Sequence, residues 1–224
     1  MQFHDHSQRH FESSVSDGGG APTTATASSE PLLTPGFPAL GDVIKLVDEA
    51  YGLQRTEALT AHILAELPTI IERIRADLPS EFVRVSKQGY RRLELHHSVL
   101  HGYQIMAMVW GPGQGTAIHD HNDLWGVEAV VLGELQVARY RIRDVAGTAL
   151  RLEPAELVEL RSGDIETIDA DQGLHLCRNP SNREVAVSLH VYRRPLDEFG
   201  IYVDDGDGWY GRREHFPRTE ASAA

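Results

Sequence analysis

The stretch WGPGQGTAIHDHNDLWGVEAVVLGEL, residues 110–135, decides the fold of this chain. Its centre is His119-Asp120-His121. Alternate side chains of a β-strand point to the same face, so the two histidines can face one point while Asp120 faces away. Two converging imidazoles are a natural start for a divalent transition-metal site. The turn-forming Gly111-Pro112-Gly113 comes before them.

The composition limits the classes of protein that this chain can belong to. Its 224 residues fit one domain with appendages. There are 21 Lys and Arg against 33 Asp and Glu, a net charge of −12, which argues against general nucleic-acid binding. We expect no membrane span and no signal peptide, because no apolar run is long enough. Cys177 is the only cysteine, which excludes an intrachain disulfide and favours the cytoplasm.

Three segments follow from composition and periodicity. Residues 1–38 are rich in Ser, Thr, Gly, Pro and Ala, and we expect a disordered tail there. This tail contains His4-Asp5-His6, but without strand signals it is not expected to hold a metal geometry. Residues 39–217 form the expected domain, and residues 218–224 form an expected disordered C-terminus.

The domain begins with a helical pattern. From Leu40, apolar residues recur at intervals of three and four, and Gly52 offers a stop. A second block starts at Thr56, and Pro68 is expected to begin a new helix rather than lie inside one. We expect these helices to pack on the outside of a β-barrel. The second apolar stripe is Leu59, Ile63, Leu67, Ile70 and Ile74.

Short strands separated by turns dominate the rest of the domain, which indicates a mainly β barrel or sandwich, including the jelly-roll and cupin forms. The expected strands are Arg91–His96, Gln104–Val109, Gly126–Leu132, Gln136–Arg143, Glu156–Leu160, Leu174–Arg178 and Val185–Tyr192.

Two motifs resemble those of the cupins. Gly113, five residues, His119-x-His121 and an apolar strand closed by Gly133 resemble the first cupin motif. His175 followed by three residues and Asn179 resembles the end of the second, although the usual Pro-x-Gly before it is absent. The resemblance implies a cupin double-stranded β-helix barrel with the N-terminal helices outside. It also makes His175 the third metal ligand.

Glu128 is the open question of this metal site. Common cupins add a glutamate shortly after the histidine pair, but Glu128 lies seven residues beyond His121. Its carboxylate could be a ligand, a group behind the ligands, or part of an ion pair. We favour a non-ligand, because the family described next has no ligand at that place.

The whole strand region resembles the thiol dioxygenases, in particular cysteine dioxygenases of the bacterial type. Four features occur in the family's order: Tyr90-x-Arg92, Trp110-Gly-x-Gly before the histidine pair, His175 fifteen residues before His190, and Ser188-x-His190-x-Tyr192.

The resemblance implies a complete site. Three neutral imidazoles would hold Fe(II), and Arg92 would bind the substrate carboxylate beside Tyr90 and Trp110. Ser188, His190 and Tyr192 would form a catalytic hydrogen-bonded relay. The implied activity joins both atoms of O2 to the sulfur of cysteine to give cysteine sulfinic acid. The implied partners are therefore a small thiol and O2, with no nucleic acid and no membrane, while the oligomeric state stays open.

Three positions depart from the animal enzymes. Gly126 stands where those enzymes have a cysteine cross-linked to the relay tyrosine, so no cross-link is expected at that position. Cys177 can approach the site because it shares strand parity with His175. Arg193-Arg194-Pro195 replaces a Ser-Pro-Pro and adds cations near the pocket mouth.

Other interpretations remain at this stage. The substrate could be 3-mercaptopropionate or another small thiol, although relatives that prefer 3-mercaptopropionate carry Gln in place of Arg92. Arg92 could instead pair with Glu94 or another acid on the barrel surface, and Arg193 or Arg194 could take over the substrate carboxylate. The protein could also be a non-catalytic metal-binding cupin module, in which the relay would have no purpose.

Overall fold

The computed structural model describes residues 36–53, 55–168 and 173–221. The chain divides into two compact units, Met1–Leu32 and Leu33–Ala224, and the described residues belong to the second. The predicted N-terminal tail therefore lies outside the described residues, except for residues 36–38. None of the described helices is long and apolar enough to cross a membrane.

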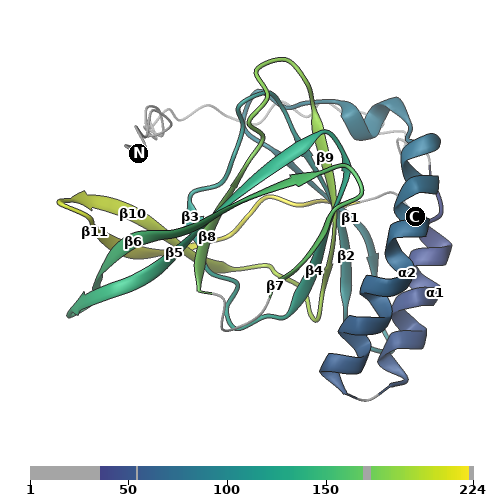
Figure 1. Cartoon of the computed structure of the whole chain (residues 1–224), viewed down its shortest axis with the longest axis horizontal. Coiled ribbons are helices and arrows are strands. Elements are labelled where there is room, and N and C mark those ends of the chain that lie inside the picture. The colour runs from purple at the N-terminus through teal and green to yellow at the C-terminus, as the bar shows by residue number, and fades with distance from the viewer. Residues whose placement is uncertain (1–35, 54, 169–172, 222–224) are drawn as a thin grey trace, which may run out of the picture. The chain divides into compact units, whose positions relative to one another are not determined.

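Two α-helices and a short 3-10 helix precede the strands (Figure 1). They are α1 (Leu40–Tyr51), α2 (Thr56–Ala76) and η1 (Ser80–Val83). The strands are β1 (Arg91–His97), β2 (Gln104–Trp110), β3 (Ile118–His119), β4 (Gly126–Leu132), β5 (Glu134–Ala146), β6 (Ala149–Arg161), β7 (Ile165–Ile168), β8 (Leu174–Arg178), β9 (Ala186–Tyr192), β10 (Phe199–Gly206), β11 (Trp209–His215) and β12 (Glu220–Ala221).

The strands form two sheets. One has the order β12-β1-β2-β9-β4-β7, and the other joins β10-β11-β6-β5-β8-β3 into a closed barrel. The hairpins β5–β6 and β10–β11 extend away from the helices, toward the left of Figure 1. This architecture confirms the expected mainly β, double-stranded β-helix fold with two N-terminal helices.

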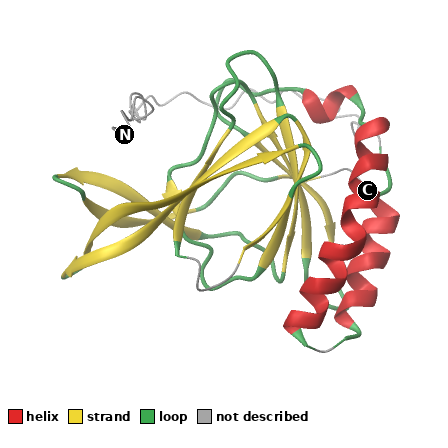
Figure 2. Ribbon diagram, in the orientation of Figure 1, coloured by secondary structure: helices red, strands yellow, loops and turns green. Residues whose placement is uncertain are grey.

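The first sheet is buried on both faces. α1 and α2 lie against one face of it (Figure 2), and the barrel interior lies at the other. Every residue of β2 and of β9 is therefore buried. Odd-numbered residues such as Ile105, Val127 and Leu189 pack with the helices, whereas even-numbered residues such as Met106 and Val130 pack in the interior. This alternation decides which side chains can reach a site inside the barrel.

The prediction for Pro68 was wrong, because α2 runs through it without a break. A proline inside a helix removes one backbone hydrogen bond and costs about 3 kcal/mol. The buried stripe of α2 offsets that cost by tertiary packing, which supplies most of the stability of protein helices. Its buried residues are Ile63, Leu67, Ile71 and Ile74.

Packed residues lie on the outer side of both predicted domain boundaries. Phe37 is buried and packs edge to face against Phe82, with ring centroids 4.9 Å apart, so the packed domain begins before residue 39. At the C-terminal boundary, Glu220–Ala221 pair with β1 in parallel. Glu220 accepts two hydrogen bonds from Arg91, at 3.0 and 2.6 Å, and this bidentate contact fixes the strand.

Candidate metal centre and substrate cavity

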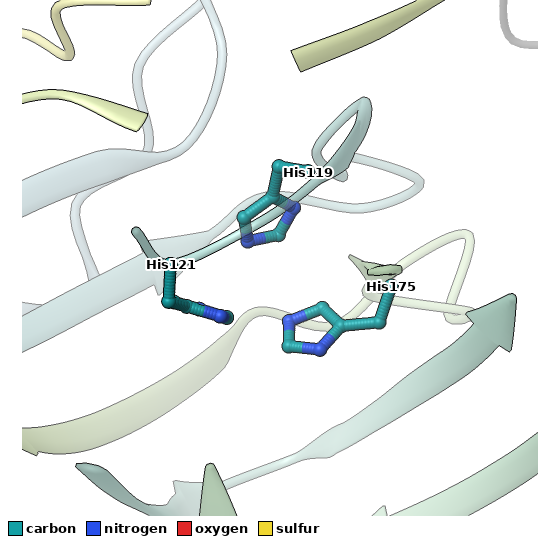
Figure 3. Close-up of side chains that lie close together, drawn as sticks. All are labelled: His119, His121 and His175. Atoms are coloured by element: carbon teal, nitrogen blue, oxygen red, sulfur yellow. The ribbon is translucent and has the colours of Figure 1, made fainter. Parts of the chain in front are cut away.

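Three histidines converge inside the barrel (Figure 3). His119 lies on β3, His175 lies directly opposite it on β8, and His121 follows β3 by two residues. Their potential ligand atoms all lie within 4.8 Å of one another. The parity argument for His119 and His121 is therefore confirmed, as is the placement of His175 beside them.

Asp120 holds this arrangement from behind. Its carboxylate points away from the His119 and His121 side chains. It accepts hydrogen bonds from the backbone N–H of Gly200 at 2.9 Å and from the Tyr202 hydroxyl at 2.9 Å. Arg212 Nε donates to the same carboxylate at 3.1 Å. These contacts lower the pKa of Asp120 against the opposing effect of burial. Asp120 thus ties the segment between the histidines to β10 and β11.

The electrostatics suit a metal. Burial lowers the pKa of His119 to about 4 and holds the pKa values of His121 and His175 well below the ordinary value. All three imidazoles are therefore neutral near pH 7, the form that binds metal ions. His119 Nδ1 donates to the carbonyl oxygen of Ala117 at 3.0 Å, which leaves Nε2 with a free lone pair. The three residues make a buried metal site.

A cavity adjoins the three histidines and gathers residues from distant strands. Eight of the nine predicted site residues line it, and Ser188 lies behind His190 instead. Most of the apolar wall could not be recognised from the sequence, because these residues look like ordinary core positions. The lining consists of Tyr90, Arg92, Met108, Trp110, Thr116, His119, His121, Glu128, Ile168, His175, Cys177, His190, Tyr192, Leu196 and Phe199.

A chain of buried hydrogen bonds runs along β9. Trp110 Nε1 donates to Ser188 Oγ at 2.9 Å, Ser188 Oγ lies 2.7 Å from His190 Nε2, and His190 Nδ1 lies 3.1 Å from the Tyr192 hydroxyl. Within the described residues, His190 Nε2 is the acceptor available to the Ser188 hydroxyl. Nδ1 then carries the imidazole hydrogen and donates it to Tyr192. The hydroxyl hydrogen of Tyr192 remains free for a molecule in the cavity.

Arg92 has donors to spare. Its side chain is buried, and Nη2 donates to the carbonyl oxygen of Leu196 at 3.0 Å. Nε and Nη1 have no hydrogen-bond partner among the described residues. The alternative pairing with Glu94 is wrong, because Glu94 accepts a hydrogen bond from Gln104 instead. Unsatisfied buried donors are costly, so this guanidinium is expected to bind a ligand.

The other candidate cations stay outside. Arg193 and Arg194 are exposed, and neither lines the cavity. Arg194 Nη2 donates to the carbonyl oxygen of Asn122 at 2.8 Å. The ring of Tyr90 instead stacks on Trp110, with centroids 4.5 Å apart, and forms a wall near Arg92.

Two further titratable groups line the cavity. Burial raises the pKa of Glu128 to about 7, and the carboxyl lies outside the cluster of potential metal ligands. This placement supports the expectation that Glu128 is not a ligand. Cys177 is buried in the wall, as parity with His175 indicated, and burial raises the pKa of its thiol.

Comparison with known proteins gives one family. The family model described as Cysteine dioxygenase type I matches residues 44–204. The chain is 26% identical to cysteine dioxygenase type 1 from Bos taurus over 164 residues, covering 65% of this chain and 81% of that protein. It is 28% identical to the Homo sapiens protein of the same name over 160 residues, covering 70% and 76%.

Solved structures with similar folds are more distant. A Klebsiella pneumoniae protein with a double-stranded β-helix domain is 19% identical at a TM-score of 0.39, covering 50% of this chain and 79% of that one. A cupin superfamily protein from Desulfitobacterium hafniense is 12% identical at a TM-score of 0.37, covering 50% and 84%.

Proposed function

The chain belongs to the cysteine dioxygenase type I family, and from that premise we propose that it uses iron(II) to add both atoms of O2 to the sulfur of cysteine. The product is cysteine sulfinic acid. The family and the three-histidine site make the protein a thiol dioxygenase, which sets aside a non-catalytic cupin module. The choice of metal and thiol rests on the arguments that follow.

The donor set fits iron(II). His119, His121 and His175 would hold the ion through three neutral nitrogens, so its double positive charge is left for anionic ligands such as a thiolate. When bound, iron(II) supplies the redox chemistry that lets O2 react with the thiol. The buried apolar wall excludes bulk water from this reaction.

The single observation that carries the choice of substrate is the unsatisfied guanidinium of Arg92 in the cavity that contains the three histidines. Two N–H groups of one guanidinium match the two oxygens of a carboxylate. A small thiol with a carboxylate satisfies both ends of the cavity, with its sulfur toward the histidines. Cysteine has this form, and we propose that Tyr90 and Trp110 flank it.

The relay provides a hydrogen-bond donor. We propose that Tyr192 presents its hydroxyl hydrogen to the cavity, where the sulfur and O2 must meet. His190 and Ser188 orient that hydroxyl, and the Trp110 indole fixes Ser188 in turn. A preorganised donor stabilises charge that develops during a reaction without first having to reorganise.

A substrate panel tests this proposal on the wild type, Arg92→Gln and Arg91→Gln. Arg91 is the matched control, since it is ion-paired with Glu220 and does not line the cavity. We expect the wild type to oxidise cysteine, to use 3-mercaptopropionate less well and to reject cysteamine, which lacks the carboxylate. Losing a buried charged contact costs roughly 2–5 kcal/mol, so kcat/KM for cysteine should fall by about 30-fold or more in Arg92→Gln. Arg91→Gln should keep the wild-type value.

Two results would count against the proposed substrate. Equal use of cysteamine by the wild type, or unchanged cysteine kinetics in Arg92→Gln, would remove Arg92 from substrate binding. A wild-type preference for 3-mercaptopropionate over cysteine would keep the carboxylate contact but exclude cysteine as the preferred thiol.

A further inference from the structure

Glu128 on β4 is a buried acid to which the proposed reaction gives no role. The residue is 2% exposed, and its side chain lines the cavity. Residue 128 lies directly opposite His190 in the antiparallel pairing of β4 with β9. Oε1 of Glu128 has no hydrogen-bond partner among the described residues, and it lies 3.8 Å from His190 Nε2. The Glu128 carboxyl therefore lies beside the Nε2 edge of the His190 ring, in the middle of the relay.

Among the described residues, Glu128 forms no ion pair with a lysine or an arginine. Within the described residues its one ion-pair contact is His190, and the charge of Glu166 on the other side is neutralised by Arg139. Burial is therefore the cause that raises the pKa of Glu128. The titratable and charged groups that line the cavity with Glu128 are His190 and Tyr192 on β9, Cys177 and His175 on β8, His119 on β3, Arg92 on β1, His121 and Tyr90. Glu166 on β7 and Arg139 on β5 belong to the neighbouring strands.

His190 can respond to Glu128 only by moving its hydrogen between the two ring nitrogens. Burial, Arg92 and His119 together lower the pKa of His190 to about 3, so the ring stays neutral. With Glu128 protonated, Nε2 accepts from Ser188 and Nδ1 donates to Tyr192. With Glu128 ionised, the negative charge beside Nε2 attracts the hydrogen to that nitrogen. Nδ1 then accepts from Tyr192 and withdraws the phenolic hydrogen from the cavity.

We propose that Glu128 is a positioning residue that acts through His190, with its protonated carboxyl holding the relay in the form that presents the Tyr192 hydroxyl hydrogen to the substrate. Ionisation of Glu128 reverses the direction of the hydrogen bonds between Ser188, His190 and Tyr192. Serine, histidine and tyrosine keep the same number of hydrogens in both forms, and the proton lost from Glu128 goes to solvent. This inference rests on the proposed dioxygenase function and on the relay within it.

The protonation state of Glu128 is expected to make turnover depend on pH. Since burial raises the pKa of Glu128 to about 7, turnover should fall as the pH rises through neutrality. Glu128→Gln is neutral at every pH, and its amide N–H groups cannot attract the imidazole hydrogen. Glu166→Gln is the matched control, because it removes the neighbouring inward carboxylate whose charge Arg139 already neutralises.

The first experiment measures sulfinate formation by the iron-loaded wild type, Glu128→Gln and Glu166→Gln between about pH 6 and 9. We expect a descending limb near neutral pH in the wild type and in Glu166→Gln, and its absence in Glu128→Gln. The inference is overturned if Glu128→Gln keeps the limb or if the wild type lacks it. A wild type that oxidises no thiol at any pH would contradict the proposed function instead.

The second experiment follows His190 without turnover. The full chain, labelled with 15N-histidine and loaded with diamagnetic zinc(II), reports by NMR which ring nitrogen carries hydrogen. In the wild type we expect the hydrogen on Nδ1 below neutral pH and on Nε2 above it, with no such change in Glu128→Gln. One tautomer across the range in the wild type would overturn the inference whatever the activity.

Discussion

Two adjacent arginines on β1 point to opposite faces of the strand and therefore have different surroundings. Arg91 and Arg92 begin β1, but Arg91 donates to Glu220 at the sheet edge. Arg92 instead lines the cavity, and two of its nitrogens have no hydrogen-bond partner in the described part of the chain. The motif resemblance singled out Arg92 from the sequence, and the structure places its side chain in the cavity wall. That Arg92 has no acidic partner within the described part of the chain could not be predicted, because Glu94 has the same parity and is bound by Gln104 only in the folded chain.

The hydroxyl of Tyr192 is the most sharply testable single group. Tyr192→Phe should keep the metal and bind thiol, but lose turnover by about a hundredfold or more, since a positioned donor is gone. Steady-state kinetics together with metal content would measure this.

The control is Tyr103→Phe. Tyr103 is also buried, but its hydroxyl donates to Asp48 of α1 at 2.8 Å, outside the barrel interior. This variant should lose about 1 kcal/mol of stability and no activity. Wild-type turnover in Tyr192→Phe would refute the relay.

At the scale of the element, the side chains of β9 alternate between the helix-facing core and the barrel interior. Val187, Leu189 and Val191 pack toward the helices, while Ser188, His190 and Tyr192 face inward. The sequence showed this pattern because Ser, His and Tyr are unusual in an otherwise apolar strand.

Other elements could not be read from the sequence. β7 is only four residues long and includes the charged Glu166, and β10 passes from an apolar start at Phe199 into acidic residues, so neither shows the full alternation of a half-buried strand. β7 pairs with the distant β4, and β10 pairs both with the adjacent β11 and with the distant β3. The pairing of β10 with β3 also explains why the structural role of Asp120 was missed: its partners Gly200, Tyr202 and Arg212 are far along the chain.

The register of β4 on β9 makes a second prediction. Gly126 lies directly opposite Tyr192, and a Cβ atom added at residue 126 would lie 2.9 Å from the Val191 carbonyl oxygen and 3.0 Å from the Tyr192 ring. Gly126→Ala should therefore displace the ring and lower kcat by about tenfold or more while the metal stays bound.

Gly41→Ala is the control for this change. Residue 41 lies in α1 with open space around the added methyl group, so we expect normal kinetics and a stability gain of roughly 0.5–1 kcal/mol. If Gly126→Ala turned over cysteine at the wild-type rate, close packing at this point would not hold the relay in place.

At the scale of the whole molecule, the barrel brings residues separated by a hundred positions into one cavity. Arg92 comes from β1, the histidines from β3 and β8, and Tyr192 from β9. The spacing of the motifs predicted each of these residues separately. The predicted barrel fold is what led us to expect them in one place. The closed sheet, the outer layer of helices and the C-terminal strand depend on long-range packing that no local pattern encodes.

The origin of the product oxygens tests the central claim most directly. Iron-loaded wild-type protein is incubated with cysteine under an atmosphere of 18O2, and the mass of the product is measured by mass spectrometry. The proposed dioxygenase predicts cysteine sulfinic acid with both oxygens of the new sulfinate labelled, and no such product from His175→Ala, which lacks one imidazole of the metal site. Cystine as the product, or a sulfinate with one labelled oxygen or none, would contradict it.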